Sequence, residues 1–485
     1  MKVFALLAAT MIGWSAASPA QAQWKPEQLP QLEAAFVAGI STDYTTIQYP
    51  FRFLSTCGAP YCFGTNPDTT YGQPDFSNGA PTPVISAKMS ETDAWVILIE
   101  TPPPMKYWGV TPYIFNRYYS SFPKDPGNSG YMTIFESLTD TTNLLLAGTT
   151  GSATPGENTF SKLAAFVITA DRKTYSDVLA QLVSIGFPST AINKLDLPLA
   201  NFPGVPMHMN LGPTGDTYTM LLRLTYPEDP AQMADYVARN PQGFYYLSPK
   251  TKRPNSPMQA TTYRIPGSGS PEPPELRTAR DGLAAQLLKE YRSMFGAIKE
   301  SDVPVKQTTN YACVTDGFIC NSDNPDGFDT AAVGNSSQFS MQADDAVLVV
   351  GVNHAISDVG TGKATYFSHT AVNVTTNQGI LAVDDEWLAG TALKAAGISS
   401  SKDPRFATYK SLYAFLISYN CPATPTPCMT IPQGDDTHPG IPIGSVMQLT
   451  GRFYLDPVGK TRPSTDEVII ERAFFMTRRL SDPGG

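Results

Sequence analysis

Charged residues are scarce in this chain of 485 residues, which has 34 lysines and arginines against 43 aspartates and glutamates. The formal net charge is -9, and no basic run is present that could neutralise phosphate groups. These features argue against nucleic acid as a partner. Histidine is rarer still, with four residues in the whole sequence, so the set of candidate acid–base or metal-binding histidines is small.

Long apolar runs are missing after the first residues. The opening MKVFALLAATMIGWSAASPAQA contains one lysine, a short apolar run and an Ala20-Gln21-Ala22 pattern, after which signal peptidases cut. No later stretch approaches the roughly 20 apolar residues that a membrane span needs. We therefore expect a signal peptide over residues 1–22, cleaved after Ala22, no membrane span, and a periplasmic or secreted protein.

The cysteines are few and closely spaced. Six are present, as the pairs Cys57 and Cys62, Cys313 and Cys320, and Cys421 and Cys428. Short loops rich in Gly, Pro and Asp favour a local disulfide within each pair, as is typical of oxidising compartments. Two-residue spacings are absent, which argues against a zinc site and against a CxxC redox motif.

The signatures of several enzyme classes are absent as well. The sequence has no GxSxG elbow, no HExxH, no GxxxxGK[ST], and no GxGxxG between a strand and a helix. Nicotinamide and flavin chemistry is disfavoured by the missing phosphate loop. We expect no cofactor, apart from the metal alternative described below.

The composition favours strands and long ordered loops. Proline (43 residues), glycine (37) and aromatic residues (11 %) are frequent, which is typical of β-rich proteins. The length predicts two or three domains. We expect a mainly β protein of the α+β class: an N-terminal sheet domain with an α+β layer over residues 23–248, a linker or surface excursion over 249–275, and a helix followed by a second β-rich domain over 276–485.

Local patterns place the elements. Alternating or fully apolar segments predict strands at 94–100, 106–119, 131–137, 143–149 and 162–170, and later at 217–226 and 243–248. Helices are predicted from a Thr174 cap to Gly186, after Asp229-Pro230, and from Leu276 to Gly296. The segments 445–455 and 466–476 resemble a last strand pair. No internal repeat of fixed period is evident.

One resemblance is carried by residues 66–119. The NPDTTY stretch, followed by the extended PPPMKYWGVTPYIFNRYY, resembles the opening of a family of exported bacterial proteins of unassigned function, with an N-x-D-T-x-Y motif. That resemblance implies a β-sandwich at this end of the chain. It implies no catalytic residues.

The strongest candidate site lies around GVNHAISDVGTGKATYFSH, which holds two of the four histidines. VLVVGVNHAI and KATYFSHTAVNV read as strands joined by turn residues, which predicts an antiparallel hairpin in which His354 pairs with His369. A second hairpin through Asn377 and Gln378 would place His369 opposite Glu386.

The two hairpins would align His354, His369 and Glu386 in a row across one face of the sheet, and this row has two chemical interpretations. His354, His369 and Glu386 form a two-histidine, one-carboxylate set for a divalent metal, or a metal-free pair in which a carboxylate orients a general base. Asp384 would share their face, whereas Asn353 and Asp385 would lie on the other. The competing interpretation is structural, because the same face is apolar and suits hydrogen-bonded core histidines.

Outside that stretch, Arg117 and Tyr118 lie in the aromatic segment YIFNRYY. A guanidinium among tyrosines suits the binding of a carboxylate or a sugar ring. The simpler interpretation is an arginine on a sheet edge whose charged end reaches water. His208 and His438 lie in loops, and we expect neither to be functional.

Two functions follow as hypotheses. The first is an exported hydrolase or lyase that acts on a small molecule or glycan, with His354, His369 and a carboxylate from residues 384–386 as catalytic groups and Arg117, Tyr118 and Asn353 as substrate contacts. The second is a non-catalytic exported binding protein with an aromatic-lined groove. The oligomeric state is left open by the sequence.

Overall fold

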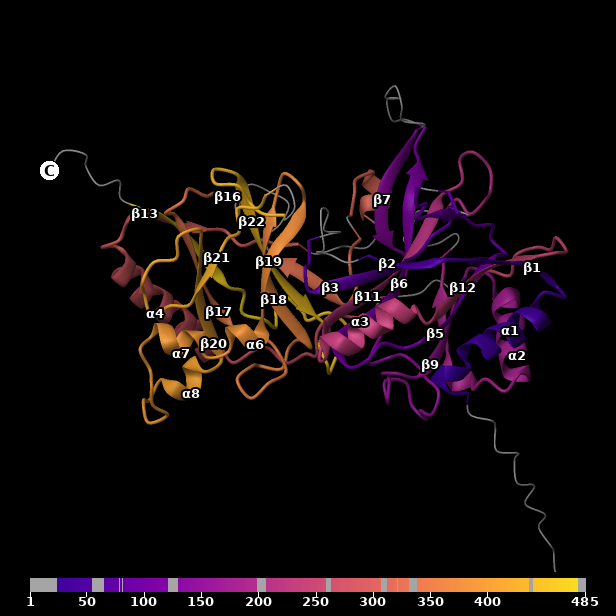
Figure 1. The fold of residues 1–485 in the computed structure, drawn as a ribbon, viewed down its shortest axis with the longest axis horizontal. Helices are drawn as coiled ribbons and strands as arrows, with labels where there is room; N and C mark the ends of the chain where they lie inside the picture. Colours follow the sequence, from indigo (N-terminus) through magenta and orange to yellow (C-terminus); the bar gives the residue numbers. More distant parts are fainter. Residues whose placement is uncertain are drawn as a thin grey trace, which may run out of the picture.

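The chain folds into two β-rich halves (Figure 1). The computed structural model describes residues 24–54, 65–77, 79–80, 82–120, 130–198, 206–258, 263–306, 312–320, 322–330, 338–435 and 439–478. We refer to residues 24–258 as the N-terminal half and to residues 263–478 as the C-terminal half. The expected signal peptide and the Cys57 and Cys62 pair lie outside the described residues, as does His438.

Two sheets form the N-terminal half. The first has the order β1 (Tyr44–Tyr49), β12 (Gln242–Pro249), β5 (Ala94–Glu100), β9 (Leu163–Thr169) and β10 (Ile192–Asp196). The second has the order β2 (Phe51–Leu54), β3 (Thr69–Pro74), β11 (Thr217–Pro227), β6 (Met105–Tyr118) and β7 (Tyr131–Ser137), with β4 (Ala87–Lys88) on β11 and β8 (Thr142–Asn143) on β6. Both sheets contribute to one apolar core, to which Trp95 comes from β5 and Trp108 from β6.

Two further sheets form the C-terminal half. One has the order β13 (Phe295–Ser301), β23 (Arg472–Arg478), β17 (Ala346–Val352), β20 (Leu412–Ser418) and β21 (Cys428–Thr430). The other has the order β14 (Val305–Lys306), β15 (Gly327–Thr330), β22 (Val446–Tyr454), β18 (Tyr366–Asn373) and β19 (Gln378–Asp384), with β16 (Gln338–Ser340) on β22. These sheets also share a core, which includes Val349, Phe367 and Phe453.

In each half some of the helices cover the outer face of the first sheet, and the others pack elsewhere. Those of the N-terminal half are α1 (Leu29–Ile40), α2 (Arg172–Ser184) and α3 (Pro230–Arg239), with short 3-10 turns at Pro26–Gln28 and Ser189–Ala191. Those of the C-terminal half are α4 (Pro274–Tyr291), α5 (Ala312–Asp316), α6 (Asp385–Leu388), α7 (Thr391–Ala395) and α8 (Phe406–Tyr409). The apolar faces of α1 and α2 pack on β5 and β9, and that of α4 packs on β17 and β20.

The two halves repeat one strand order. In the first sheet of each half, the central strand, β5 or β17, has an antiparallel neighbour on either side. The last two strands of each of these sheets run parallel, β9 with β10 and β20 with β21. An aspartate turn precedes the central strand in both: Asp93 accepts from the Ser90 N–H at 2.6 Å, and Asp345 from the Gln342 N–H at 2.9 Å. A structural repeat is therefore present although the sequence shows no fixed period, because the connecting loops differ in length.

The predicted helix ends are partly correct. Asp229 caps α3 and Pro230 occupies its first position, as predicted. The cap of α2 is Asp171, whose carboxylate accepts from the Thr174 N–H, so the prediction of Thr174 as the cap was wrong. α4 ends at Tyr291, and the residues that were assigned to its last turn begin β13.

Three strand predictions were wrong. In the segment predicted as a strand at 143–149 only Asn143 pairs, as the second residue of β8. The last two strands, β22 and β23, lie in different sheets and do not form a pair. The same is true of β17 and β18, which were expected to form a hairpin. Every residue of β17 and β18 is buried, so their patterns could not indicate which strand each would join.

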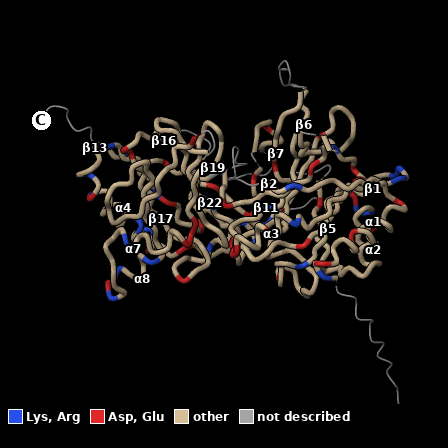
Figure 2. The backbone as a smooth tube through the Cα atoms, viewed as in Figure 1, with Lys and Arg blue, Asp and Glu red and all other residues tan. Residues whose placement is uncertain are grey.

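Two of the predicted disulfides lie in described residues and are formed, Cys313 with Cys320 and Cys421 with Cys428. Acidic and basic residues are interspersed along the backbone of both halves (Figure 2). Across the described residues, the helices are either too short or too polar to cross a membrane.

Candidate functional site

The structure places His354 and His369 in one core without pairing them across strands. His354 follows the end of β17, whereas His369 lies within β18 opposite Val383 of β19 and Gly451 of β22. The predicted cross-strand pairing of His354 with His369, and the predicted position of Glu386 opposite His369, were therefore wrong. Both imidazoles are fully buried, and the Phe367 ring lies between them, with centroids 4.8 Å from His354 and 5.1 Å from His369.

His354 has a carboxylate partner from outside the predicted set. Its Nδ1 lies 2.7 Å from Oε1 of Glu272, in the segment before α4. Thr361 donates to the same oxygen, and the Ile469 N–H donates to Oε2 at 2.6 Å. Burial opposes ionisation of Glu272, but its interactions with His354 and these donors outweigh burial and lower its pKa. The pair is sealed from solvent, since neither side chain is exposed.

His369 is held by a tyrosine. Its Nε2 lies 2.6 Å from the hydroxyl of Tyr413 on β20, and its Nδ1 lies 4.0 Å from Glu471. Burial lowers the pKa of His369 to about 3, so the ring is neutral at ordinary pH. Burial also raises the pKa of Glu471, although Thr330 donates to its Oε1. A neutral, enclosed imidazole of this kind suits a core position.

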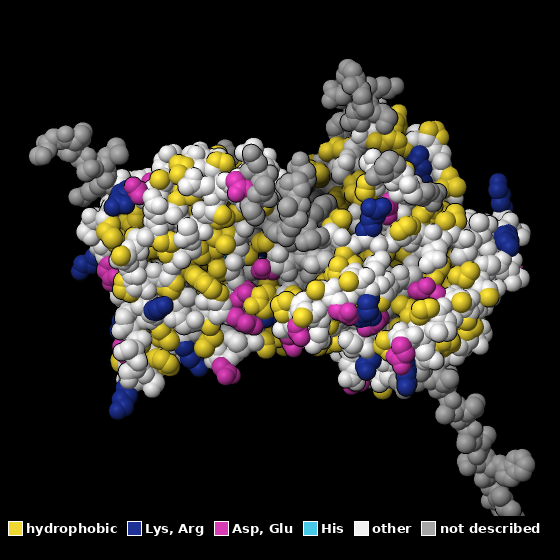
Figure 3. Space-filling model, in the orientation of Figure 1, with side chains coloured by type: hydrophobic (Ala, Val, Ile, Leu, Met, Phe, Trp, Pro, Cys, Tyr) yellow, Lys and Arg dark blue, Asp and Glu magenta, His cyan; other side chains and the backbone are white. Residues whose placement is uncertain are grey.

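The carboxylates predicted to join the histidines lie elsewhere. Asp384 caps α6, so residues 385 and 386 belong to a helical turn and not to a strand face. Lys106 of the N-terminal half binds Asp385 at 2.8 Å and Glu386 at 3.0 Å. Figure 3 shows acidic side chains gathered where the two halves meet. The predicted row of His354, His369 and Glu386 is therefore not assembled.

Asn353 is buried and uses its side chain within the fold. Its Nδ2 donates to the Asp385 carbonyl at 2.9 Å, and its Oδ1 accepts from the Ala355 N–H at 3.1 Å. These bonds tie the end of β17 to α6. Both polar atoms of the Asn353 side chain, which was predicted to contact a substrate, are therefore hydrogen-bonded within the fold.

Arg117 lies in a cluster that the sequence did not indicate. Its Nη2 donates to the Pro206 carbonyl at 2.8 Å and lies 3.3 Å from Nε2 of His208, while its Nη1 lies 3.9 Å from Asp216. The same Asp216 lies 3.8 Å from Nδ1 of His208 and accepts from the His208 N–H at 2.7 Å. A guanidinium, an imidazole and a carboxylate therefore meet where β6 ends and β11 begins. Tyr118, predicted as a further contact, is half-buried and packs on Tyr131.

Burial differs sharply within this cluster. The Asp216 side chain is fully buried, whereas the His208 side chain is 43 % exposed. Burial raises the pKa of Asp216, against the hydrogen bond from the His208 backbone and the charge of Arg117. Within the described residues, Oδ1 of Asp216 and Nη1 of Arg117 have no hydrogen-bond partner. The only sequence signal was the loop of Pro, Gly and Met residues around His208, a composition that many non-functional loops share.

A cleft of about 370 Å³ lies in the C-terminal half. It is lined by Arg277 and Arg280 of α4, by residues 300–303 at the end of β13 and after it, and by Thr465, Val468 and residues 470–472. Arg472 is paired with Glu300, and Arg280 with Asp281. No aromatic side chain lines this cleft.

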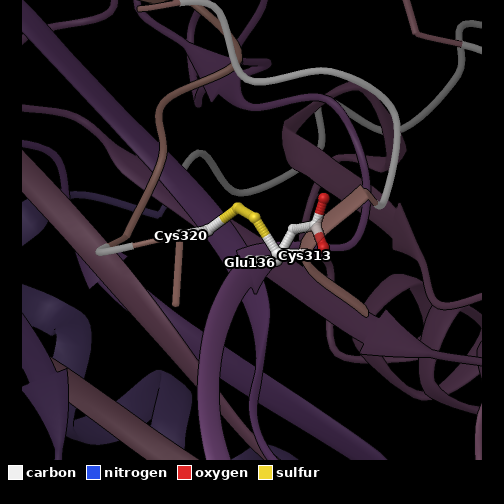
Figure 4. A group of neighbouring side chains, drawn as sticks. All are labelled: Glu136, Cys313 and Cys320. Atoms are coloured by element: carbon white, nitrogen blue, oxygen red, sulfur yellow. A yellow bond between two sulfur atoms is a disulfide. The ribbon is translucent and has the colours of Figure 1, made fainter. Parts of the chain in front are cut away.

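A metal-ligand arrangement occurs once among the described residues. Glu136 of β7 lies beside Cys313 and Cys320, with candidate ligand atoms within 4.8 Å of one another (Figure 4). The two sulfurs are joined in a disulfide. They lack the thiolate form that binds metals. In this redox state the group does not fit a metal ion.

Comparisons with known proteins give no activity. No family model matches the chain, and no curated protein matches it. Two similar solved structures are an uncharacterized protein from Burkholderia cenocepacia and a protein from Vibrio parahaemolyticus. The first is 12 % identical with a TM-score of 0.37, over 92 % of this chain and 86 % of the other. The second is 9 % identical with a TM-score of 0.34, over 93 % of this chain and 96 % of the other.

Proposed function

We propose that the protein is an exported hydrolase or lyase in which His208 is the acid–base residue, Asp216 orients it, and Arg117 binds an anionic group of the substrate. One observation carries this proposal. Of the three histidines in the described residues, His208 is the one that reaches solvent, and it does so while facing a buried carboxylate. The two buried histidines lack this access, which a general base requires.

The geometry favours one tautomer of His208. Asp216 lies on the Nδ1 side, so a proton on Nδ1 is stabilised and the lone pair remains on Nε2. Arg117 faces that lone pair with Nη2 and leaves Nη1 without a hydrogen bond. A substrate carboxylate that engages the guanidinium would weaken its contact with Nε2. The imidazole could then take a proton from the substrate or from a water.

Export is part of the proposal. The amino-terminal pattern that ends at Ala22 supports it, and so do the two disulfides, because such bonds persist in oxidising compartments. The two sheets that share a core in the N-terminal half support the β-sandwich that the family resemblance implies at that end of the chain.

The test compares His208→Gln with a control from the same loop. Leu211 is 62 % exposed, so Leu211→Ala should leave the fold unchanged. The mature wild-type protein is screened against esters, glycosides and uronate-containing glycans. We expect His208→Gln to lower the rate by about 10²- to 10⁴-fold, and Leu211→Ala to leave it unchanged. Full activity in His208→Gln would rule out the acid–base role.

The second candidate function is non-catalytic binding of a small polar ligand in the cleft of the C-terminal half. The supporting observation is Arg277, which is exposed in the cleft lining and has no ion-pair partner among the described residues. A free guanidinium suits a carboxylate or phosphate group. The aromatic-lined groove that we expected from the sequence is not part of this proposal, because the lining is charged and aliphatic.

Calorimetry separates the two functions. Titration with small carboxylates and phosphates should give binding that Arg277→Ala abolishes and His208→Gln leaves intact, if the cleft is the ligand site. Binding that depends on His208 and Arg117 and not on Arg277 would favour the enzyme.

A further inference from the structure

The boundary between the halves repeats one short motif. Asn66-Pro67-Asp68 precedes β3, and Asn324-Pro325-Asp326 precedes β15, which occupies the same place in the strand order of the other half. A cysteine stands four residues before each asparagine. The repeat is short, so it is recognisable only once the strand orders are compared.

Each motif contacts a strand of the opposite half. Tyr366 of β18 donates its hydroxyl to Oδ2 of Asp68 at 2.7 Å. Tyr107 of β6 donates its hydroxyl to Oδ2 of Asp326 at 3.1 Å. β6 and β18 are equivalent strands, each lying beside the long central strand of its sheet. The two tyrosines and the two aspartates therefore make the same contact twice, in opposite directions.

Two buried arginines also make equivalent contacts across the boundary between the halves. Arg223 of β11 lies opposite Tyr71 of β3, and its guanidinium donates to the carbonyls of Ser322 and Asp323 in the C-terminal half. Arg452 of β22 lies opposite Asp329 of β15 and donates to Thr65 of the N-terminal half at 2.7 Å. Each arginine thus binds the segment just before the other half's Asn-Pro-Asp motif.

The backbone beyond these arginines is also repeated. Three residues after each arginine the chain has a positive φ, 54° at Tyr226 and 57° at Leu455. The Tyr226 N–H donates to the Asp68 carbonyl at 3.1 Å, and the Leu455 N–H donates to the Asp326 carbonyl at 2.7 Å. A left-handed conformation is uncommon for a non-glycine residue, so its recurrence at equivalent positions reflects a shared architecture.

The centre of the boundary is apolar and contains side chains from both halves. Tyr107, Tyr366, Tyr454 and Leu455 are buried together, with Tyr226 at their edge. The Tyr107 and Tyr454 rings lie 5.1 Å apart, and the Tyr226 and Tyr366 rings lie 6.3 Å apart. An apolar centre surrounded by duplicated hydrogen bonds is the arrangement of an isologous dimer interface.

We propose that the chain contains two copies of one unit, and that the boundary is a self-complementary docking surface whose partner is the second copy of that unit. Each copy places its Asn-Pro-Asp segment on the other, as two subunits of a two-fold dimer would. The covalent connection through residues 259–271 is then unnecessary for the association itself. This inference is independent of the proposed function.

The first test cuts the connection in the folded, full-length protein. A protease recognition sequence is inserted after Ile265, which is 87 % exposed. After cleavage, we expect both fragments to co-elute at the volume of the uncut protein in gel filtration, and to separate only under denaturing conditions. Fragments that elute separately, or that aggregate once cut, would overturn the proposal.

The second test uses the uncut chain and the symmetry of the contacts. Tyr107→Phe and Tyr366→Phe each remove one of the two equivalent hydroxyls. We expect each to lower the denaturant midpoint, and the two shifts to agree within about twofold. A shift in one variant alone would contradict an isologous interface. In the cut protein, each variant should raise the dissociation constant of the fragments by about tenfold.

The control for both tests is Tyr131→Phe. The Tyr131 hydroxyl binds the Gly215 carbonyl at 2.8 Å within the N-terminal half, away from the boundary. This variant should leave the dissociation constant of the cut fragments unchanged. An equal rise in this control would show that loss of any tyrosine hydroxyl loosens the protein, and would remove the support for the docking surface.

Discussion

Nδ1 of His354 lies 2.7 Å from Oε1 of Glu272, and both side chains are fully buried although they are separated by 82 positions in the sequence. Glu272 lies in the extended segment that we had interpreted as a linker. That segment therefore supplies a charged partner to the core of the C-terminal half, in addition to connecting the halves. The relationship determines how the protein should respond to acid.

The pKa of Glu272 is lower in the folded protein than in the unfolded chain, so ionised Glu272 stabilises the fold at pH values above its unfolded pKa. This stabilisation is lost as the pH falls through the pKa that Glu272 has in the folded protein. We expect the free energy of unfolding to decline as the pH is lowered past 4.5, the ordinary value for this carboxyl. Chemical denaturation across pH 3 to 7 measures this decline in the free energy of unfolding. In Glu272→Gln this acid-dependent part should be absent, and the variant should be less stable at pH 7 by about 3 to 5 kcal/mol. An unchanged pH profile in Glu272→Gln would contradict the assignment.

The low pKa of His369 makes a separate prediction. The folded state holds the imidazole neutral down to about pH 3, whereas in the unfolded chain it gains a proton near 6.5. The unfolded state is therefore favoured progressively as the pH falls below 6.5, with a slope of up to about 1.4 kcal/mol per pH unit. Nuclear magnetic resonance of the histidine ring protons should show no titration of His369 between pH 5 and 8. A midpoint within that range would show that the ring is not enclosed as described.

The exposure of the histidines predicts their chemical reactivity. Diethylpyrocarbonate should modify His208 in the native protein and leave His354 and His369 unmodified, because the latter two are fully buried. Peptide mapping by mass spectrometry measures the modification at each site. Bound substrate analogue should slow the reaction at His208 if it occupies the Arg117 cluster. Equal modification of the three residues in a protein that remains folded would contradict the burial on which the acid–base proposal depends.

The cysteines predict a protein without free thiols. Cys313–Cys320 and Cys421–Cys428 are formed, and Cys57 with Cys62 is the expected third pair. Thiol titration of the unfolded, unreduced mature protein should give no reaction, and its first residue should be Gln23. Because each loop is short, the double variant Cys421→Ser with Cys428→Ser should lower stability by only about 2 to 3 kcal/mol. Two reactive thiols in the wild-type protein would show that the third disulfide is absent.

The buried Arg117 predicts a strong dependence on its charge. Arg117→Ala would leave Asp216 buried without its cation, and we expect a loss of about 3 to 5 kcal/mol in stability at pH 7. Arg117→Lys keeps the charge and should recover part of that loss. Thermal unfolding of the two variants beside the wild type measures the difference. If Arg117→Ala were as stable as the wild type, the cluster would not be the coupled unit that we describe.

Local sequence determined most of the individual elements. β5, β6, β7, β9, β11 and β12 lie where apolar runs and turn residues predicted strands, and Asp229 with Pro230 begins α3 as expected. These predictions were correct because strand propensity, turn chemistry and helix capping depend on neighbours within a few residues. The close cysteine pairs are local in the same sense.

Only the tertiary structure decided which strands pair and which side chains meet. β17 and β18 are buried on both faces, so a hairpin and a crossing between two sheets are equally compatible with their sequences. The contacts of His354 with Glu272 and of Arg117 with Asp216 join residues far apart in the chain, and no spacing rule connects them. The repeat of the two halves was hidden for a related reason. Strand order is set by packing of whole sheets, which tolerates loops of different length and unrelated side chains, whereas a sequence period does not.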